Sequence, residues 1–273
     1  MPKKPDLTEA YLDLMKKTLS ASIFPQARMG PAPEYKRRPR LTAAMRLIKE
    51  RGLTPINLTA YSEQEVREGR IWGLLGFTMV GHDRLNNVQF CVEDVLKRKV
   101  PGDLVETGVW KGGTSIFMRA ILKAYGVTDR KVWAADSFEG LPVPKDRKDG
   151  WDLSHVDILK VSLEEVQENF ARFDLLDDQV VFLKGWFADT LPTAPIEKIA
   201  VLRLDGDLYS STMDGLVNCY HKVSPGGYVI ADDYFSWEAS RRACHDFLDK
   251  IGQKPDIIKI DWAGAYWQVP RAK

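Results

Sequence analysis

Short apolar runs alternate with segments of helical periodicity from Asp103 to the end of the chain. This alternation is typical of βαβ units, whose strands form a largely parallel sheet covered by helices. The pattern predicts strands at 103–107, 131–135, 180–184, 199–204, 226–231, 256–260 and 264–268. It predicts intervening helices at 113–125, 162–173, 212–223 and 237–251. Because the last two runs are close together, we expect an α/β fold with a mostly parallel seven-stranded sheet that ends in one antiparallel hairpin.

The first hundred residues have a different pattern, in which helical spacing dominates. Apolar residues recur every three or four positions in four segments, at 7–15, 41–51, 62–69 and 83–99. The stretch 25–40 is rich in proline, arginine and lysine, which favours an exposed connection or a flexible lid. We therefore expect residues 1–100 to form a helical cap and residues 101–273 to form the α/β domain.

Composition narrows the classes of function. The chain has 273 residues, and its 39 basic and 38 acidic side chains give a net charge of +1, so we expect neither nucleic acid nor a membrane surface as a partner. The three cysteines are widely spaced and form no CxxC pair, which argues against a disulfide framework and a thiolate zinc site. The N-terminus lacks the apolar core of a signal peptide, and no apolar run approaches the length of a membrane span. We expect a cytoplasmic protein.

Acidic residues mark the ends of two predicted strands. The aspartates that follow the strands at 199–204 and 226–231 are Asp205, Asp207, Asp232 and Asp233. If these strands are parallel neighbours, their carboxyl ends meet at the edge of the sheet where such folds bind ligands. Carboxylates at close range oppose one another's ionisation, and a hard divalent cation offsets that repulsion. One aspartate at a strand end often caps a helix or turn, but four at two neighbouring strand ends favour a metal site.

The predicted strand at 103–107 runs into a glycine-rich turn and then a helix. Gly108, Gly112 and Gly113 do not have the GxGxxG spacing of an NAD-binding turn, and the absence of a P-loop pattern disfavours a metal-dependent phosphohydrolase. The next strand is followed by Asp136, where an acidic residue would accept hydrogen bonds from ribose hydroxyls. Glu106, near the end of the first strand, could hold an ammonium group. These features predict a nucleoside-type cofactor with an amino-acid tail, unless the glycines are only structural.

Four ordered motifs then carry a family resemblance over roughly residues 70–268. They read PGDLVETGVWKGG at 101–113, ADSFEGLP at 135–142, LDGDLYSST at 204–212 and ADDY at 231–234. In these motifs the chain resembles the macrocin O-methyltransferase family, which contains sugar O-methyltransferases of macrolide and aminocoumarin antibiotic pathways. The resemblance implies a class I S-adenosylmethionine (SAM) fold, which is Rossmann-like, and Mg²⁺ dependence. It also implies a homodimer or higher homo-oligomer, with the N-terminal cap as the oligomerisation arm. Lys111 stands where the family usually has arginine. The positive charge is kept, but the planar guanidinium group with its paired N–H donors is lost.

The resemblance also implies roles for individual residues. The expected magnesium ligands are Asp205, Asp232 and Asp233, and the expected general base is Asp207. The expected SAM-binding residues are Met79, Glu106, Thr107, Gly108, Gly112, Asp136, Ser137 and Asp189, with Trp186 or Phe187 near the adenine. In an extended strand end, residues two apart face the same side, so Asp205 and Asp207 could reach one site while Gly206 leaves room. The segment from Tyr209 begins the next helix, so Ser211 or Thr212 is expected to cap it rather than act as a nucleophile.

The chemistry of methyl transfer points to a diol as the acceptor. A protonated alcohol is a poor nucleophile, but Mg²⁺ would polarise one hydroxyl and orient its neighbour while a carboxylate takes the proton. We expect a small-molecule glycoside or another diol, with specificity determined by the connection 141–161 that contains Trp151 and His155. One alternative is a catechol-type O-methyltransferase, whose pocket would sandwich a flat aromatic ring. A second is a non-catalytic SAM-binding protein, which would bind SAM without turnover.

Overall fold

The computed structural model describes residues 6–24, 28–29, 51, 62–70, 72–73 and 75–270. Its helices are α1 (Leu7–Leu19), α3 (Glu63–Glu68), α4 (His82–Lys97), α5 (Gly113–Ala124), α6 (Leu163–Arg172), α7 (Phe187–Thr190), α8 (Tyr209–Cys219) and α9 (Glu238–Lys250). Its strands are β1 (Arg28–Met29), β2 (Trp72–Gly73), β3 (Asp103–Thr107), β4 (Val132–Asp136), β5 (Val180–Lys184), β6 (Ile199–Leu204), β7 (Val223–Ala231), β8 (Ile258–Lys259) and β9 (Ala265–Gln268). The predicted lid at 25–40 and the predicted helix at 41–51 lie almost entirely outside the described residues.

The described part of the chain contains a seven-stranded sheet in the order β5-β4-β3-β6-β7-β9-β8. Strands β5, β4, β3, β6 and β7 pair in parallel, and β9 is antiparallel to both of its neighbours. The predicted mostly parallel sheet with a final hairpin is therefore confirmed. Strands β6 and β7 are neighbours, with Leu204 opposite Ala231. This register places the first aspartate after each strand side by side.

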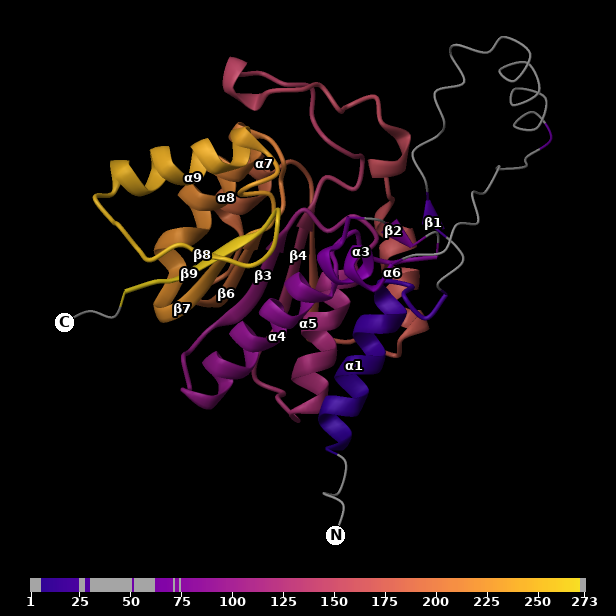
Figure 1. The fold of residues 1–273 in the computed structure, drawn as a ribbon. Coiled ribbons are helices and arrows are strands. Elements are labelled where there is room, and N and C mark those ends of the chain that lie inside the picture. Colours follow the sequence, from indigo (N-terminus) through magenta and orange to yellow (C-terminus); the bar gives the residue numbers. More distant parts are fainter. Residues whose placement is uncertain are drawn as a thin grey trace.

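Helices cover both faces of the sheet, because successive strand residues point to opposite sides. Leu104 and Val201 belong to the hydrophobic cluster that includes side chains of α1, α4 and α5. The adjacent residues Val105 and Leu202 belong to the cluster that includes side chains of α8 and α9. Figure 1 shows the resulting layers, with α1, α4 and α5 grouped together and α8 next to α9.

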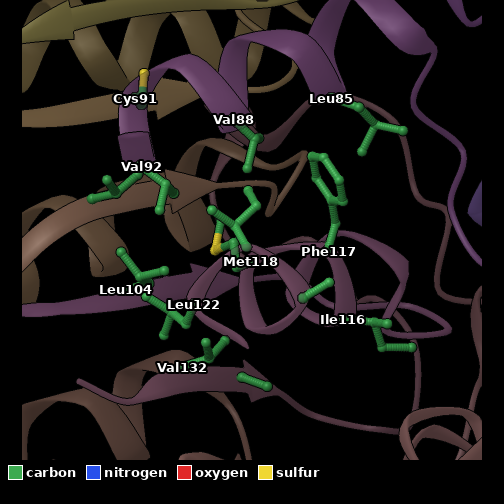
Figure 2. Close-up of a cluster of buried hydrophobic side chains, with 14 of the residues drawn as sticks. Leu85, Val88, Cys91, Val92, Leu104, Ile116, Phe117, Met118, Leu122 and Val132 are labelled. Carbon is green, nitrogen blue, oxygen red and sulfur yellow. The ribbon is translucent and has the colours of Figure 1, made fainter. Parts of the chain in front are cut away.

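The helix α4 packs against α5 through the apolar face that its sequence predicts. Leu85, Val88 and Val92 are buried and lie over Phe117 and Met118 of α5 (Figure 2). Burying each such side chain stabilises the fold by about 1.5–3 kcal/mol. Because α4 precedes the expected boundary at residue 100 yet belongs to this core, the N-terminal segment contributes to the core of the α/β part. The division into two domains stays a prediction.

The three cysteines are small side chains of the core. Cys91, Cys219 and Cys244 are buried and unpaired. Among the described residues, none of the helices combines the length and the apolar character that crossing a membrane requires.

Candidate active site

A pocket of about 800 Å³ lies at the carboxyl ends of the parallel strands, a size typical of small-molecule sites. It is lined by residues at the ends of β3, β4, β6 and β7, by the segment after β4, and by the turn between β8 and β9. The predicted SAM-binding residues on its wall are Met79, Glu106, Gly108, Asp136 and Ser137, together with Trp186 and Phe187. Thr107, Gly112 and Asp189 do not line it. Their contact with SAM stays a prediction.

The structure brings the three predicted metal ligands together. Asp205, Asp232 and Asp233 each offer one carboxylate oxygen, and these oxygens lie within 4.8 Å of one another. Asp207 lies beside them: burial, and then the nearby Asp205 carboxylate, raise the pKa of Asp207 to about 7. Burial also raises the pKa of Asp205 and of Asp233 well above the ordinary aspartate value. The cluster therefore resists full ionisation unless a cation joins it.

The backbone that brings Asp207 to this cluster is a turn, and the extended strand end that we expected is wrong. Strand β6 ends at Leu204, and Asp207 has a φ of 57°, in the left-handed region. Few non-glycine residues adopt that region, and aspartate is one that tolerates it. The Leu208 N–H donates to the Gly206 carbonyl at 2.5 Å. The local turn, rather than strand alternation, thus places Asp207 next to Asp205.

Arg203, on β6, is the buried cation at the centre of the site. Its side chain is 2% exposed and forms an ion pair with Glu106 on β3. Its Nη1 atom lies 2.8 Å from a carboxylate oxygen of Asp205, and its Nη2 atom donates to Asp232 at 2.5 Å. A buried guanidinium of this kind needs such partners, because an unpaired buried charge costs several kcal/mol. Arg203 consequently ties together the ends of β3, β6 and β7.

Arg84, on α4, supplies a second buried guanidinium from outside the sheet. It donates to the Asp232 oxygen that Arg203 leaves free, and its Nε donates to Asp261 at 3.0 Å. Burial opposes ionisation of Asp232, but Arg203 and Arg84 outweigh it and hold the pKa of Asp232 below the usual aspartate value. The other oxygen of Asp261 accepts the N–H groups of Ala263 and Gly264. Arg84 therefore connects Asp232 to the β8–β9 turn.

The donor set fits a hard divalent cation. In the described part of the chain, the two guanidinium groups of this network face six carboxylates, those of Glu106, Asp205, Asp207, Asp232, Asp233 and Asp261. One Asp233 oxygen accepts from the Ser236 hydroxyl at 3.0 Å, whereas its Oδ2 is buried with no hydrogen-bond partner among the described residues. A buried carboxylate oxygen without a partner is costly, and oxygen donors are what Mg²⁺ binds. Asp233 and Asp205 are the more available ligands, since both oxygens of Asp232 are engaged by arginines.

Two predicted cofactor residues are engaged within the protein itself. Asp136 accepts the backbone N–H groups of Val109 at 2.7 Å, of Trp110 at 3.3 Å and of Phe138 at 2.8 Å, which fixes the glycine-rich turn against the end of β4. Glu106 is 1% exposed and accepts from Arg203 and from the Ser115 hydroxyl. Both acidic groups still line the pocket. Binding of ribose by Asp136 and of an ammonium group by Glu106 stays a prediction.

Gly108 is required where the turn leaves β3. Its φ is +92°, and a Cβ atom there would lie 1.8 Å from the Asp205 carbonyl oxygen. The Asp205 N–H in turn donates to the Thr107 carbonyl at 2.8 Å. The glycine therefore allows the ends of β3 and β6 to touch, which brings the glycine-rich turn next to the carboxylate cluster.

The segment 141–161 forms one wall of the pocket. It arches over the carboxyl ends of the strands between β4 and α6 (Figure 1). The residues of this segment on the wall are Leu141, Pro142, Val143, Lys145, Leu153, Val156, Ile158 and Leu159. The side chains singled out earlier, Trp151 and His155, are exposed and not on the wall. The wall is thus mostly apolar, with Lys145 as its one charged residue among those named.

Sequence reasoning missed both arginines, although a signal for each is present. Arg203 interrupts the apolar run of β6, and a charge inside a buried strand is nearly always paired. Arg84 precedes Val88 by four positions and so lies on the buried face of α4. The expected helix cap at Ser211 or Thr212 is wrong, because α8 begins at Tyr209 and its N-cap side chain makes no capping bond.

Comparison with known proteins decides the family. A family model described as Macrocin-O-methyltransferase (TylF) matches residues 8–269, almost the whole chain. The chain belongs to the macrocin O-methyltransferase family. The resemblance seen in the four motifs is thereby confirmed.

Individual relatives agree with the family assignment. This methyltransferase is 47% identical over 272 residues to the 8-demethyl-8-(2,3-dimethoxy-alpha-L-rhamnosyl)-tetracenomycin-C 4'-O-methyltransferase of Streptomyces olivaceus, covering 96% of the chain and 94% of the relative. It is 46% identical over 268 residues to the mycinamicin III 3''-O-methyltransferase of Micromonospora griseorubida, with 95% and 96% coverage. The solved structure of the O-methyltransferase NovP superposes with a TM-score of 0.83 at 46% identity, covering 97% of this chain and 100% of that one. The chain is a SAM-dependent O-methyltransferase with the predicted class I fold.

Proposed function

We propose that this enzyme transfers the methyl group of SAM to one hydroxyl of a diol on the sugar of a glycosylated natural product, with Mg²⁺ bound at the carboxylate cluster. The observation that carries the metal proposal is the unpartnered, buried Oδ2 of Asp233 among three converging carboxylates. The sugar acceptor is supported by the relatives, whose names give O-methylation of a rhamnosyl-tetracenomycin and of mycinamicin III.

The reaction needs a nucleophilic oxygen, a methyl donor and a place for the proton. Asp205, Asp232 and Asp233 would hold the ion through carboxylate oxygens, and a bound Mg²⁺ supplies Lewis-acid polarisation of the acceptor hydroxyl. The acceptor oxygen forms the new C–O bond with an electron pair as the S–CH₃ bond of the sulfonium breaks, leaving a neutral thioether. Asp207, which lines the pocket beside the cluster, takes the hydroxyl proton.

The two substrates would occupy different parts of the pocket. SAM would bind on the side of β3 and β4, where the wall includes Met79, Glu106, Gly108 and Ser137, with Trp186 and Phe187 near the adenine. The acceptor would lie between the carboxylate cluster and the segment 141–161. Its sugar hydroxyls would face the carboxylates, and its less polar part would contact the apolar side chains of that segment.

We also propose that the enzyme is a homodimer or a higher homo-oligomer built through its N-terminal part. Leu7 and Leu14 of α1 are 79% and 58% exposed, and residues seven apart lie on the same face of a helix. An exposed apolar face on the first helix is a surface that a second copy could cover. Sedimentation velocity would test this proposal, because a monomer at micromolar concentration contradicts it.

A methyl-transfer assay tests the proposed function. Enzyme, labelled SAM and a panel of diol glycosides and catechols would be incubated before and after complete chelation, and again after Mg²⁺ is restored. We expect transfer to a glycoside that chelation abolishes and Mg²⁺ restores. Asp233→Asn should weaken metal binding measured by calorimetry, whereas Asp178→Asn at an exposed position serves as the matched control.

The remaining outcomes separate the alternatives. Transfer that persists after complete chelation would reject the role of the metal. Transfer to catechols alone would favour the catechol-type enzyme, and SAM binding without transfer to any acceptor would favour a non-catalytic protein.

A further inference from the structure

Asp149 is a buried acidic residue in a segment with little regular structure. The segment 141–161 contains only two short 3₁₀ turns, η2 (Arg147–Asp149) and η3 (Asp157–Leu159). Asp149 ends the first of them and is 1% exposed, although it does not line the pocket. Its burial calls for partners, because a buried carboxylate without hydrogen bonds is costly.

The partners of Asp149 come from two different parts of the fold. One carboxylate oxygen accepts the backbone N–H groups of Lys145 and Asp146, each at 3.0 Å, which closes the loop on itself. The other accepts the backbone N–H of Ser210, in the first turn of α8, at 2.7 Å. Burial opposes ionisation of Asp149, but these backbone donors outweigh it and lower its pKa. The carboxylate is therefore held by three backbone N–H groups.

Asp149 supplies the helix cap that the local sequence of α8 lacks. The first N–H groups of a helix have no partner within it, and a side-chain oxygen just before the helix usually accepts one of them. Leu208 is the N-cap residue of α8 and cannot do so. Asp149 accepts the Ser210 N–H from 61 residues away in the chain, and its negative charge is favourable at a helix N-terminus.

This single side chain joins two walls of the pocket. Lys145 lines the pocket from the loop, and Ser210 and Ser211 line it from α8. Ser210 also follows Asp207 by three residues, so the tether ends next to the proposed base. Lys148 adds two further contacts from the loop, to the Tyr209 hydroxyl of α8 at 3.1 Å and to Asp246 of α9 at 3.0 Å, but its side chain is more exposed and these contacts are therefore weaker.

We propose that Asp149 is a positioning residue that holds the segment 141–161 against α8 and thereby determines the affinity for the acceptor. The part of the proposal that concerns the acceptor rests on the proposed function. Loss of the tether should widen the acceptor side of the pocket and leave the SAM side, formed by β3 and β4, unchanged.

Limited trypsin digestion tests the tether without any assay of activity. Lys145, Arg147 and Lys148 place cleavage sites in the tethered loop. Asp149→Ala removes hydrogen bonds to a charged group, so cleavage there should accelerate by roughly tenfold or more. Asp149→Asn keeps one acceptor oxygen and should give an intermediate rate. Asp152→Ala is the matched control, because Asp152 lies in the same segment, is exposed and, within the part of the chain that the structure describes, accepts hydrogen bonds from Ser154 alone.

Steady-state kinetics then test the effect on the acceptor. We expect Asp149→Ala to raise the KM for the acceptor about tenfold while the SAM dissociation constant changes by less than about twofold. If cleavage and the acceptor KM both stay at wild-type values, the proposal is wrong. It is also wrong if both substrates bind more weakly and the thermal midpoint falls in parallel, since that shows general destabilisation. Should Asp149→Ala not fold, Asp149→Asn decides by the same criteria.

The digestion also separates failure of this proposal from failure of the proposed function. If the wild-type enzyme methylates no member of the acceptor panel, faster cleavage of the Asp149 variants still supports the tether. Cleavage at the wild-type rate rejects it regardless of the acceptor.

Discussion

Asp232 and Asp233 are adjacent in the sequence but differ in how their carboxylates are satisfied. Each oxygen of Asp232 accepts from an arginine, whereas one oxygen of Asp233 accepts from Ser236 and its buried Oδ2 has no N–H or hydroxyl donor among the described residues and faces neighbouring carboxylates. Paired arginines orient a carboxylate and lower its proton affinity, while an unpaired oxygen is free to bind a cation. We infer that Asp232 is oriented in advance and that Asp233 would gain most from the proposed metal.

Replacement of Asp207 tests the assignment of the base. Asp207→Asn keeps the shape of the side chain but removes the proton acceptor, so kcat should fall by about 10²- to 10⁴-fold. The SAM dissociation constant should stay near the wild-type value, because Asp207 is placed on the acceptor side. Single-turnover methyl transfer and calorimetry measure the two quantities. Asp249→Asn on the exposed end of α9 is the control, and an unchanged kcat in Asp207→Asn would remove Asp207 as the base.

Individual site residues could be predicted from the sequence where a polar residue interrupts or ends an apolar run. The aspartates after β6 and β7 were visible because they end apolar runs, and their convergence followed from the expected neighbouring strands. The pairing of Arg203 with Glu106 could not be derived, because it depends on the lateral register of β3 and β6. The turn at Asp207 could not be predicted either. The residue in the left-handed backbone conformation is an aspartate and not the glycine that usually marks such a turn.

At the scale of elements, the contact between the ends of β3 and β6 depends on Gly108. Gly108→Ala would place a Cβ atom 1.8 Å from the Asp205 carbonyl oxygen at a φ of +92°. We expect it to reduce the free energy of unfolding by at least about 3 kcal/mol through strain and overpacking. Urea unfolding of the variant and of the wild type measures this loss, provided that the two proteins have the same m-value.

Gly126 provides the matched control for this substitution. It also has a positive φ, +64°, but a Cβ atom there would meet nothing within 4 Å. Gly126→Ala should therefore cost about 1 kcal/mol from backbone strain alone. Equal losses at the two positions would contradict a steric role for Gly108.

Most elements of the α/β part could be predicted because their apolar periods are clear. The strands at 103–107, 180–184 and 199–204 match the structure, whereas β7 begins at Val223, before its predicted start. The helix α8 begins at Tyr209, before the periodic range 212–223 but where the segment from Tyr209 led us to expect a helix start, and its first turn donates to Asp149 from a distant part of the chain. Local periodicity therefore located the elements, while contacts distant in the sequence fixed their ends.

At the scale of the whole molecule, Asp94 links α4 to the sheet and should make stability depend on pH. The hydrogen bond from Arg98, and to a lesser degree that from the Tyr228 hydroxyl, outweigh burial and lower the pKa of Asp94. A lowered pKa in the folded state stabilises the fold above the unfolded-state pKa of about 4, and this contribution is lost as the pH falls through the folded-state value. Asp94→Asn should thus be less stable than wild type by about 1–2 kcal/mol at neutral pH.

Urea unfolding of both proteins from neutral pH to about pH 3 checks the sign of this effect. The difference in the free energy of unfolding should be full at neutral pH and should shrink below about pH 4, where the unfolded-state carboxylate protonates. Asp178→Asn, at an exposed position, should show no comparable trend. A difference that grows as the pH falls would contradict the assignment.

The thiols of this enzyme all lie in its interior, at Cys91, Cys219 and Cys244. Burial raises the pKa of Cys219 to about 11 and that of Cys244 to about 12, and it raises the pKa of Cys91 well above its ordinary value. Because the thiolate is the reactive form, maleimide reagents should leave the native protein unlabelled at neutral pH. Trp151→Cys, at a position that is 75% exposed, would then create a single site for a fluorescent dye on the segment above the pocket. The enzyme is thus ready for optical measurement of acceptor binding with all of its natural cysteines in place.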